Sequence, residues 1–159
     1  MAWKEIHHLY NEKIDFTVKV YFPTHFEALR KMYCGPYHEF IKSIFSSDVW
    51  SDNSGGKSRS TFFRSIDNKY ILKAVQSREI KMFQDMGPSY FEYLISSFSR
   101  QCPSAIAKTL GIFKIKIKMS ARHRTEQYYV VLMENLLLGV NPENVIKYDL
   151  KGSRRNRFI

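Results

Sequence analysis

The chain has 159 residues, and hydrophobic residues make up 44% of it, which suits one domain with a buried core and excludes a disordered chain. Its formal charge of +10 favours a phosphate-bearing partner such as nucleic acid, a nucleotide or anionic lipid. Because it has only Cys34 and Cys102, no membrane-spanning apolar run and no secretion signal at its start, we expect a reduced, intracellular protein without a disulfide scaffold or zinc finger.

The positive charge is concentrated in the last third of the chain. Residues 1–107 hold 14 basic and 11 acidic residues, whereas residues 108–159 hold 11 basic and 4 acidic ones, a net charge of +7. Two clusters produce this excess, one over residues 108–124 and one over residues 147–157. The solvent-exposed face of a strand would show a cluster like the first one. The second cluster is therefore the stronger indication of a phosphate-bearing partner.

The first part of the chain predicts one strand and two helices. Apolar residues alternate over Ile14–Phe22, which indicates a half-buried strand. Pro23 ends it, and Thr24 is a candidate N-cap for a helix running to about Met32. Residues Tyr37–Phe45 have helical spacing, and the polar segment Ser46–Lys57 reads as a loop.

The middle of the chain predicts a hairpin and two short helices. Strands are expected over Ser58–Ile66 and Lys69–Val75, joined by a turn at Asp67-Asn68. Ser77 is a plausible N-cap for a helix that Gly87-Pro88 breaks, and a second helix follows from Ser89.

The last part predicts further strands. Residues Ile112–Met119 alternate between apolar side chains, expected to face inward, and lysines, expected to face outward. The continuous apolar run Gln127–Glu134 suggests a central strand, and Val145–Lys151 suggests one more. Strands that follow helices with short gaps predict an α+β fold, an antiparallel β-sheet with packed helices, and not a βαβ array.

A glycine pair lies in the predicted loop, within the sequence Ser54-Gly55-Gly56-Lys57-Ser58. It does not fit a P-loop, because the position five before Gly56 is Ser51 and a strand-like segment follows. The alternatives are a glycine-rich turn that closes over nucleotide phosphates, as in protein kinases, and an ordinary structural turn.

A lysine interrupts the apolar strand Tyr70–Lys73 a few residues downstream. In kinases a lysine at this place in the sheet holds nucleotide phosphates and pairs with a glutamate on the next helix, for which Glu79 is the candidate. The simpler alternative is that Lys73 faces solvent at the end of its strand.

Two more segments could carry chemistry. Met133–Leu137 follows the predicted central strand and could be a hinge whose backbone binds an adenine, or an ordinary turn leading to Gly139. The segment Tyr148–Arg157 places four basic residues in seven around a Gly-Ser turn, a compact phosphate site in which Arg can bind in bidentate fashion.

The string DLKGSRRNR at Asp149–Arg157 resembles a signature of the phosphatidylinositol phosphate kinases. Together with SGGKS at Ser54–Ser58, YILK at Tyr70–Lys73 and VLMENLL at Val131–Leu137, it is most similar to the type III branch, the PIKfyve-like phosphatidylinositol 3-phosphate 5-kinases. The resemblance spans about residues 16–157 and divides the chain into an N-terminal extension, residues 1–13, and the N-terminal lobe of a kinase domain, residues 14–159.

The resemblance implies an ATP-dependent lipid kinase that phosphorylates a phosphoinositide headgroup, with Mg bound by groups outside this chain. It implies a cytoplasmic protein, peripheral on endosomal membrane, that works with a C-terminal lobe or another protein partner. The implied ATP-binding residues are Gly55, Gly56 and Lys57 in the loop, Lys73 and Glu79 at the phosphates, and Glu134 and Leu136 beside the adenine. The implied lipid-binding residues are Lys151 and Arg157.

The family's catalytic and metal-binding aspartates lie after the DLKGS motif, so we expect these 159 residues alone to have no kinase activity. Two other functions compete with an ATP-binding lobe. One is a non-catalytic basic module that binds an anionic membrane or a protein partner. The other is nucleic-acid binding, which only the charge favours and no motif supports.

Overall fold

The computed structural model describes residues 14–50, 61–119, 124–146 and 148, and everything below concerns these residues. They form one antiparallel six-stranded sheet with the order β1-β5-β6-β4-β3-β2. The strands are β1 (Ile14–Tyr21), β2 (Ser47–Trp50), β3 (Phe62–Ser65), β4 (Tyr70–Val75), β5 (Thr109–Met119) and β6 (Arg124–Glu134). The predicted α+β fold with an antiparallel sheet is confirmed, and so is the central place of β6, between β5 and β4.

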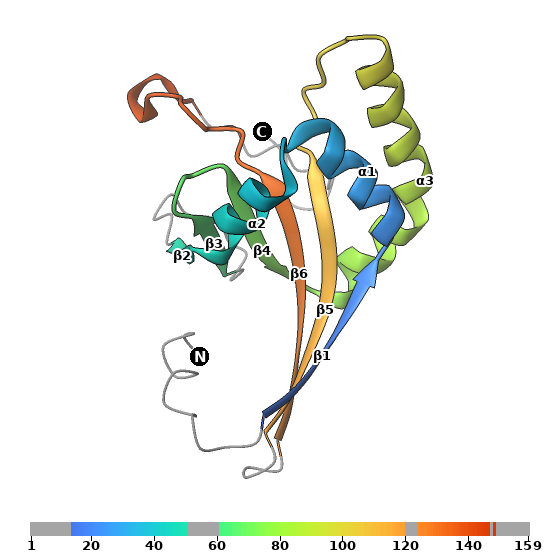
Figure 1. The fold of residues 1–159 in the computed structure, drawn as a ribbon, viewed down its shortest axis with the longest axis vertical. Coiled ribbons are helices and arrows are strands. Elements are labelled where there is room, and N and C mark those ends of the chain that lie inside the picture. Colours follow the sequence, from blue (N-terminus) through green and yellow to red (C-terminus); the bar gives the residue numbers. More distant parts are fainter. Residues whose placement is uncertain (1–13, 51–60, 120–123, 147, 149–159) are drawn as a thin grey trace, which may run out of the picture.

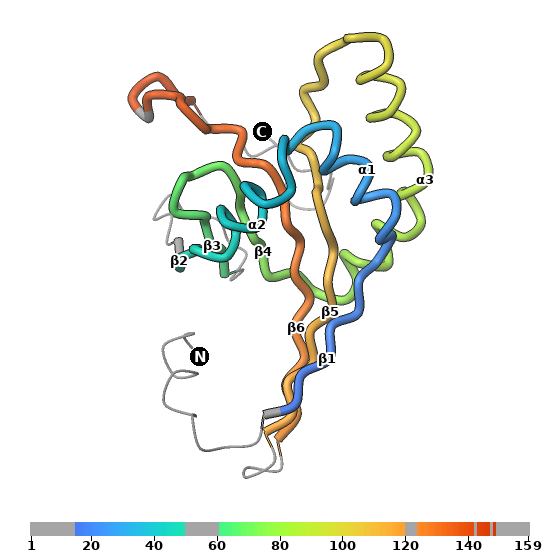
Figure 2. Tube along the Cα trace, viewed as in Figure 1, coloured from blue at the N-terminus to red at the C-terminus, as the bar shows by residue number. Residues whose placement is uncertain are grey.

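Three helices cover the upper part of the sheet, α1 (Pro23–Tyr33), α2 (Tyr37–Phe45) and α3 (Ser77–Ser99). Figure 1 shows α1 and α3 together beside β1 and β5, and α2 beside β3 and β4. The tube in Figure 2 shows that the helices lie beside only part of the sheet, because the lower halves of β1, β5 and β6 run on together beyond all three helices. No helix in the described part of the chain is long and apolar enough to cross a bilayer.

The core consists of two clusters. In the larger, Phe26 and Leu29 of α1 and five residues of α3 and β5 are buried together: Ile80, Tyr90, Phe91, Leu94 and Ile112. In the smaller, Phe40 of α2 packs with strand residues Tyr70, Leu110 and Leu132. Strand alternation places Leu132 and the neighbouring Val131 on opposite faces, so each cluster belongs to one face of the sheet.

The break predicted at Gly87-Pro88 is wrong, because α3 is continuous and contains Pro88. A proline inside a helix costs about 3 kcal/mol through the lost N–H bond and crowding. Here the buried side chains of Ile80 on one side of Pro88 and Leu94 on the other hold both halves against one core. Gly87 contributes by leaving room for the Phe22 ring, which would lie 3.1 Å from an added Cβ.

Helix starts also differ from the prediction. Thr24 does not cap α1: the N-cap is Phe22, with a left-handed backbone (φ 46°), and Pro23 begins the helix, where a missing N–H costs nothing. In α3 the N-cap is Gln76 and not Ser77. Aromatic contacts of Phe22 with Phe26, Phe83 and Phe91 explain how its backbone strain is tolerated.

The remaining boundary differences concern strands. The segment Ser46–Lys57 is not all loop, because β2 pairs with β3 through Val49 and Phe63. The hairpin around Asp67-Asn68 is confirmed by the pairing of β3 with β4. No strand forms at Val145, Ile146 or Tyr148, the only described residues of the last predicted strand, because a 3-10 turn at 142–144 precedes them and nothing pairs with them.

Burial in the lower sheet differs from what the alternation suggested. The alternation of β5 is present, but β1 is not half-buried: Phe16 is 72% exposed, and Val18 and Val20 are exposed as well. The reason is that none of the helices in the described residues extends along this part of the sheet. An alternating sequence shows that a strand has an apolar face, not that something packs on it.

Candidate functional site

Lys73 and Glu79 form the ion pair that the sequence suggested. Lys73 lies on β4 and Glu79 in the first turn of α3, and the Lys73 Nζ donates to the Glu79 Oε1 at 3.1 Å. Both side chains are partly exposed, at 30% and 37%, so the pair remains open to a further charged group. The site therefore has one lysine that is oriented by a carboxylate and accessible from solvent.

A capping box holds Glu79 in place. The Gln76 backbone N–H donates to the Glu79 Oε2 at 2.8 Å, and the Glu79 backbone N–H donates to the Gln76 carbonyl at 3.0 Å. The two oxygens of Glu79 thus have separate tasks, one toward the helix start and one toward Lys73. Gln is not one of the usual N-cap residues, so nothing in the sequence indicated a helix start at Gln76.

The electrostatics of Glu79 fit this arrangement. Partial burial alone would raise the pKa of its carboxyl, but the Gln76 N–H and the Lys73 ammonium hold the pKa below its ordinary value. The carboxylate is therefore charged at neutral pH, as an orienting partner for a lysine must be.

Apolar side chains surround Lys73 on its face of the sheet. Its partners across the strands are Phe62 of β3 and Val131 of β6. Two residues before Lys73, Ile71 pairs with Met133, and both are half-buried on the same face. These two residues are called the Ile71–Met133 shelf below. A flat aromatic ring could lie on it next to the lysine.

The predicted hinge, Met133–Leu137, begins with the last two residues of β6 and continues into a turn that Asn135 shapes. The Asn135 N–H donates to the Lys69 carbonyl at 2.9 Å, and its side-chain Nδ2 donates to the Asn68 carbonyl at 2.7 Å. Its Oδ1 accepts from the Leu137 N–H at 3.1 Å. Sequence reasoning missed this role, although an Asn that bonds to the backbone two residues on is a known turn signal.

Leu136 lies on this turn with its side chain 58% exposed. Within the described residues, no hydrogen bond uses the Leu136 backbone N–H. The turn ends at Gly139, whose φ of 74° suits glycine. A backbone donor without a partner among the described residues thus follows Met133 by three positions in the chain.

The structure places the Glu134 side chain away from Lys73. Glu134 pairs with Tyr70 whereas Lys73 pairs with Val131, so the two side chains lie on opposite faces of the sheet. The Glu134 Oε1 accepts from both the backbone N–H (2.7 Å) and the Nζ (2.9 Å) of Lys108. This bond ties the end of β6 to the segment before β5.

Five other predicted site residues lie outside the described part of the chain: Gly55, Gly56, Lys57, Lys151 and Arg157. Among the described residues, no group of three His, Cys, Asp or Glu side chains is arranged to hold a metal ion. The described site therefore consists of Lys73, Glu79 and the hinge.

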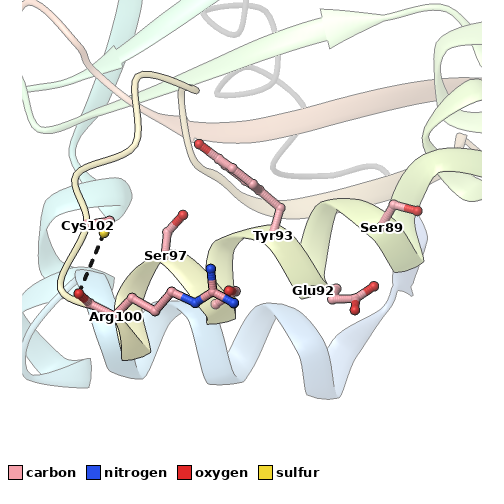
Figure 3. Close-up of a pocket in the computed structure, with 7 residues that line it drawn as sticks. Ser89, Glu92, Tyr93, Ser97, Arg100 and Cys102 are labelled. Atoms are coloured by element: carbon pink, nitrogen blue, oxygen red, sulfur yellow. Dashed lines mark hydrogen bonds between the residues drawn. The ribbon is translucent and has the colours of Figure 1, made fainter.

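A cavity of about 380 Å³ lies elsewhere, along α3 and the segment that leaves it. Figure 3 shows its lining, with the Cys102 Sγ donating to the Arg100 carbonyl at 3.6 Å. The lining residues are Ser89, Glu92, Tyr93, Ser96, Ser97, Arg100 and Cys102. Tyr93 shares a helical stripe with Glu79, Met82 and Met86, and both methionines are exposed.

The lower sheet carries a row of lysines. Lys114, Lys116 and Lys118 alternate along β5, and Lys19 of β1 lies directly opposite Lys114. We call these four residues the lysine face. In the described portion of the chain none of them forms an ion pair, although like charges directly opposite each other are destabilising.

Comparison with known proteins decides the family. The profile of the family described as phosphatidylinositol-4-phosphate 5-kinase matches residues 43–159. The chain belongs to this family. It is a family of lipid kinases, so the resemblance noted in the sequence is confirmed, as is the likeness of the fold to an N-terminal kinase lobe.

Individual relatives agree with the type III assignment. The chain is 38% identical to the 1-phosphatidylinositol-3-phosphate 5-kinase FAB1A of Arabidopsis thaliana over 92% of its own length, and 34% identical to the human 1-phosphatidylinositol 3-phosphate 5-kinase over 91%. It is 34% identical to the FAB1 enzyme of Saccharomyces cerevisiae over 89%. The chain spans only 8%, 7% and 6% of these three relatives, respectively.

Proposed function

We propose that this chain is the ATP-binding lobe of a phosphatidylinositol 3-phosphate 5-kinase. The observation that carries the proposal is the Lys73–Glu79 pair at 3.1 Å, in the place where kinases hold the nucleotide phosphates. The printed names of the relatives supply the substrate class, phosphatidylinositol 3-phosphate.

The described residues fit ATP. The adenine would lie on the Ile71–Met133 shelf, with the Leu136 N–H, which has no partner among the described residues, as a donor to the ring and the Glu134 backbone beside it. The phosphates would meet the Lys73 ammonium, and Gly55, Gly56 and Lys57 would cover them. ATP supplies the phosphoryl group, and the task of these residues is to position it.

A second lobe would complete the active site. Its aspartates would bind Mg and take the proton from the lipid hydroxyl, so the 159 residues alone would not catalyse the reaction. Support comes from the exposed stripe on α3, where Met82 is 65% and Met86 50% exposed on the side of Glu79. A lobe that closes over the nucleotide would cover this stripe.

The lysine face would dock the domain on an anionic, phosphoinositide-bearing endosomal membrane from the cytoplasmic side, with Lys151 and Arg157 recognising the lipid phosphate. Each lysine near such a surface contributes about 1 kcal/mol. The same face supports the second candidate function, a non-catalytic module that binds anionic membrane or a protein partner. Nucleotide binding separates the two candidates.

The test is an equilibrium titration of the 159-residue chain with a fluorescent ATP analogue. Lys73→Ala should weaken binding by about tenfold or more, because a hydrogen bond to a charged group is worth about 1.5–3 kcal/mol. Lys69→Ala is the matched control: Lys69 is close in sequence and paired with Asp67, but lies in the turn before β4.

Equal affinity of Lys73→Ala and the unaltered chain would show that Lys73 is a surface residue and would remove the kinase proposal. Circular dichroism on both variants excludes unfolding as the cause of a loss.

A second measurement addresses activity and partners. The chain alone, with ATP, Mg and vesicles containing phosphatidylinositol 3-phosphate, should bind the vesicles and form no bisphosphate. Product formation would contradict the need for a second lobe. Binding to duplex DNA with a steep salt dependence, and none to vesicles, would favour nucleic acid instead.

A further inference from the structure

The outer edge of β1 is open. β1 is the first strand of the sheet and pairs only with β5, so among the described residues nothing pairs with its other side. It is 8 residues long, twice the length of β2 at the opposite edge, and every residue from Asp15 to Val20 is exposed. Such a row of unpaired backbone groups is a template for another strand.

The two faces of β1 differ in chemistry. On one face Phe16, Val18 and Val20 are 72%, 45% and 41% exposed. Below they are called the apolar edge. On the other face Lys19 lies opposite Lys114, with no carboxylate paired to either among the described residues. A strand added beside β1 would therefore meet apolar side chains on one face. On the other face it would meet Asp15 and Lys19 of β1, with the net positive charge of the β5 lysines behind them.

We propose that β1 is a docking edge for an extended segment of a partner protein in which apolar and acidic residues alternate. The segment would extend the sheet by one strand through backbone hydrogen bonds. Its apolar side chains would cover the apolar edge, and its carboxylates would neutralise Lys19 and relieve the repulsion from Lys114. This proposal is independent of nucleotide binding and of the kinase function.

Charge decides against a second copy of this chain as the occupant. An antiparallel pair of β1 strands centred on Thr17 would place Asp15 opposite Lys19, which is locally favourable. Each copy, however, carries a formal charge of +10, and pairing would bring two lysine faces onto one continuous sheet. An acidic partner gains from the same field that opposes self-association.

The experiment uses the full chain and a fluorescein-labelled peptide of four Glu-Val repeats, as long as β1. We expect binding, with slower amide hydrogen exchange at residues 14–21. Lys19→Glu should weaken binding of the Glu-Val peptide by about tenfold, because a cross-strand ion pair becomes a like-charge pair. The same variant should strengthen binding of a Lys-Val peptide, because there a like-charge pair becomes an ion pair. Lys81→Glu, the same charge change on the exposed surface of α3, should leave both affinities unchanged.

A second variant tests the apolar edge. Val18→Ser should weaken binding of the Glu-Val peptide, but the variant should still prefer the Glu-Val peptide to the Lys-Val peptide. A peptide of Glu-Ser repeats should bind no better to the unaltered chain than to this variant.

Other outcomes would overturn the proposal. If Lys19→Glu leaves the affinity unchanged, or slower exchange appears on β5 and not on β1, the peptide binds through the charge of the lysine face and does not pair with β1. If sedimentation shows a dimer that Lys19→Glu dissociates, a second copy occupies the edge. If replacing Ile6 and Leu9 by serine raises the peptide affinity, residues 1–13 of the chain itself compete for it.

Discussion

The upper and lower halves of the sheet share the strands β1, β5 and β6 but differ in their surroundings. In the upper half, α1 and α3 cover one face and α2 the other, and Leu94 and Ile112 are completely buried. In the lower half, the lysine face and the apolar edge both meet solvent. The upper half thus carries the stability and the lysine–glutamate pair, whereas the lower half is a surface for contacts. Substitutions should separate these roles.

The largest effect is expected in the covered half. Leu94→Ala should lower the free energy of unfolding by about 2–5 kcal/mol, because it removes buried methyl groups and leaves a cavity between α1 and α3. Urea denaturation measures this. Val18→Ala on the bare half is the matched control and should cost less than about 1 kcal/mol. Similar losses would mean that something covers the lower half in solution.

A smaller effect is expected at the β3–β4 turn. The Asp67 Oδ1 accepts from the hydroxyls of Ser43 (2.6 Å) and Ser65 (2.8 Å), and both serines are buried. Asp67→Ala leaves these hydroxyls without their acceptor and should cost about 1–3 kcal/mol. Asp85→Ala, an exposed carboxylate on α3, should change stability by less than about 0.5 kcal/mol in the same denaturation series.

The same carboxylate predicts a pH dependence. Burial raises the pKa of Asp67, but hydrogen bonds from Ser43, Ser65 and the Lys69 backbone outweigh it, so the net pKa lies below its ordinary value. A carboxyl whose pKa is lower in the folded than in the unfolded chain stabilises the fold above its unfolded pKa. Stability should therefore fall as the pH drops below about 4. Asp67→Asn should show a weaker decline, and an equal decline would place the effect elsewhere.

The smallest effect on stability is expected on the lysine face. Lys116→Gln should change the free energy of unfolding by less than about 0.5 kcal/mol, since its cross-strand partners Thr17 and Gln127 carry no charge. It should nevertheless weaken flotation with anionic vesicles about fivefold, the equivalent of about 1 kcal/mol. A stability loss equal to that of Leu94→Ala would abolish the distinction between the two halves.

Parts of the candidate site were accessible from the sequence. Lys73 and Glu79 are only six positions apart, and a strand followed at once by a helix leaves few ways to place them, so their pairing could be anticipated. The Glu134 side chain could not be placed, because its bond to Lys108 depends on how β5 and β6 align. Asn135 escaped notice because its bond to Asn68 joins segments 67 residues apart.

Local patterns by themselves determined most of the elements and the class of the fold. Alternation predicted β1 and β5, a continuous apolar run predicted β6, the hairpin pattern predicted β4, and helical spacing predicted α1 and α2, because these patterns arise within a few residues of chain. The tertiary structure alone decided that α3 continues through Pro88, since the buried faces on both sides outweigh one lost hydrogen bond. It also decided which alternating faces are covered. Phe16 and Ile112 look alike in the sequence, yet one lies in solvent and the other under two helices.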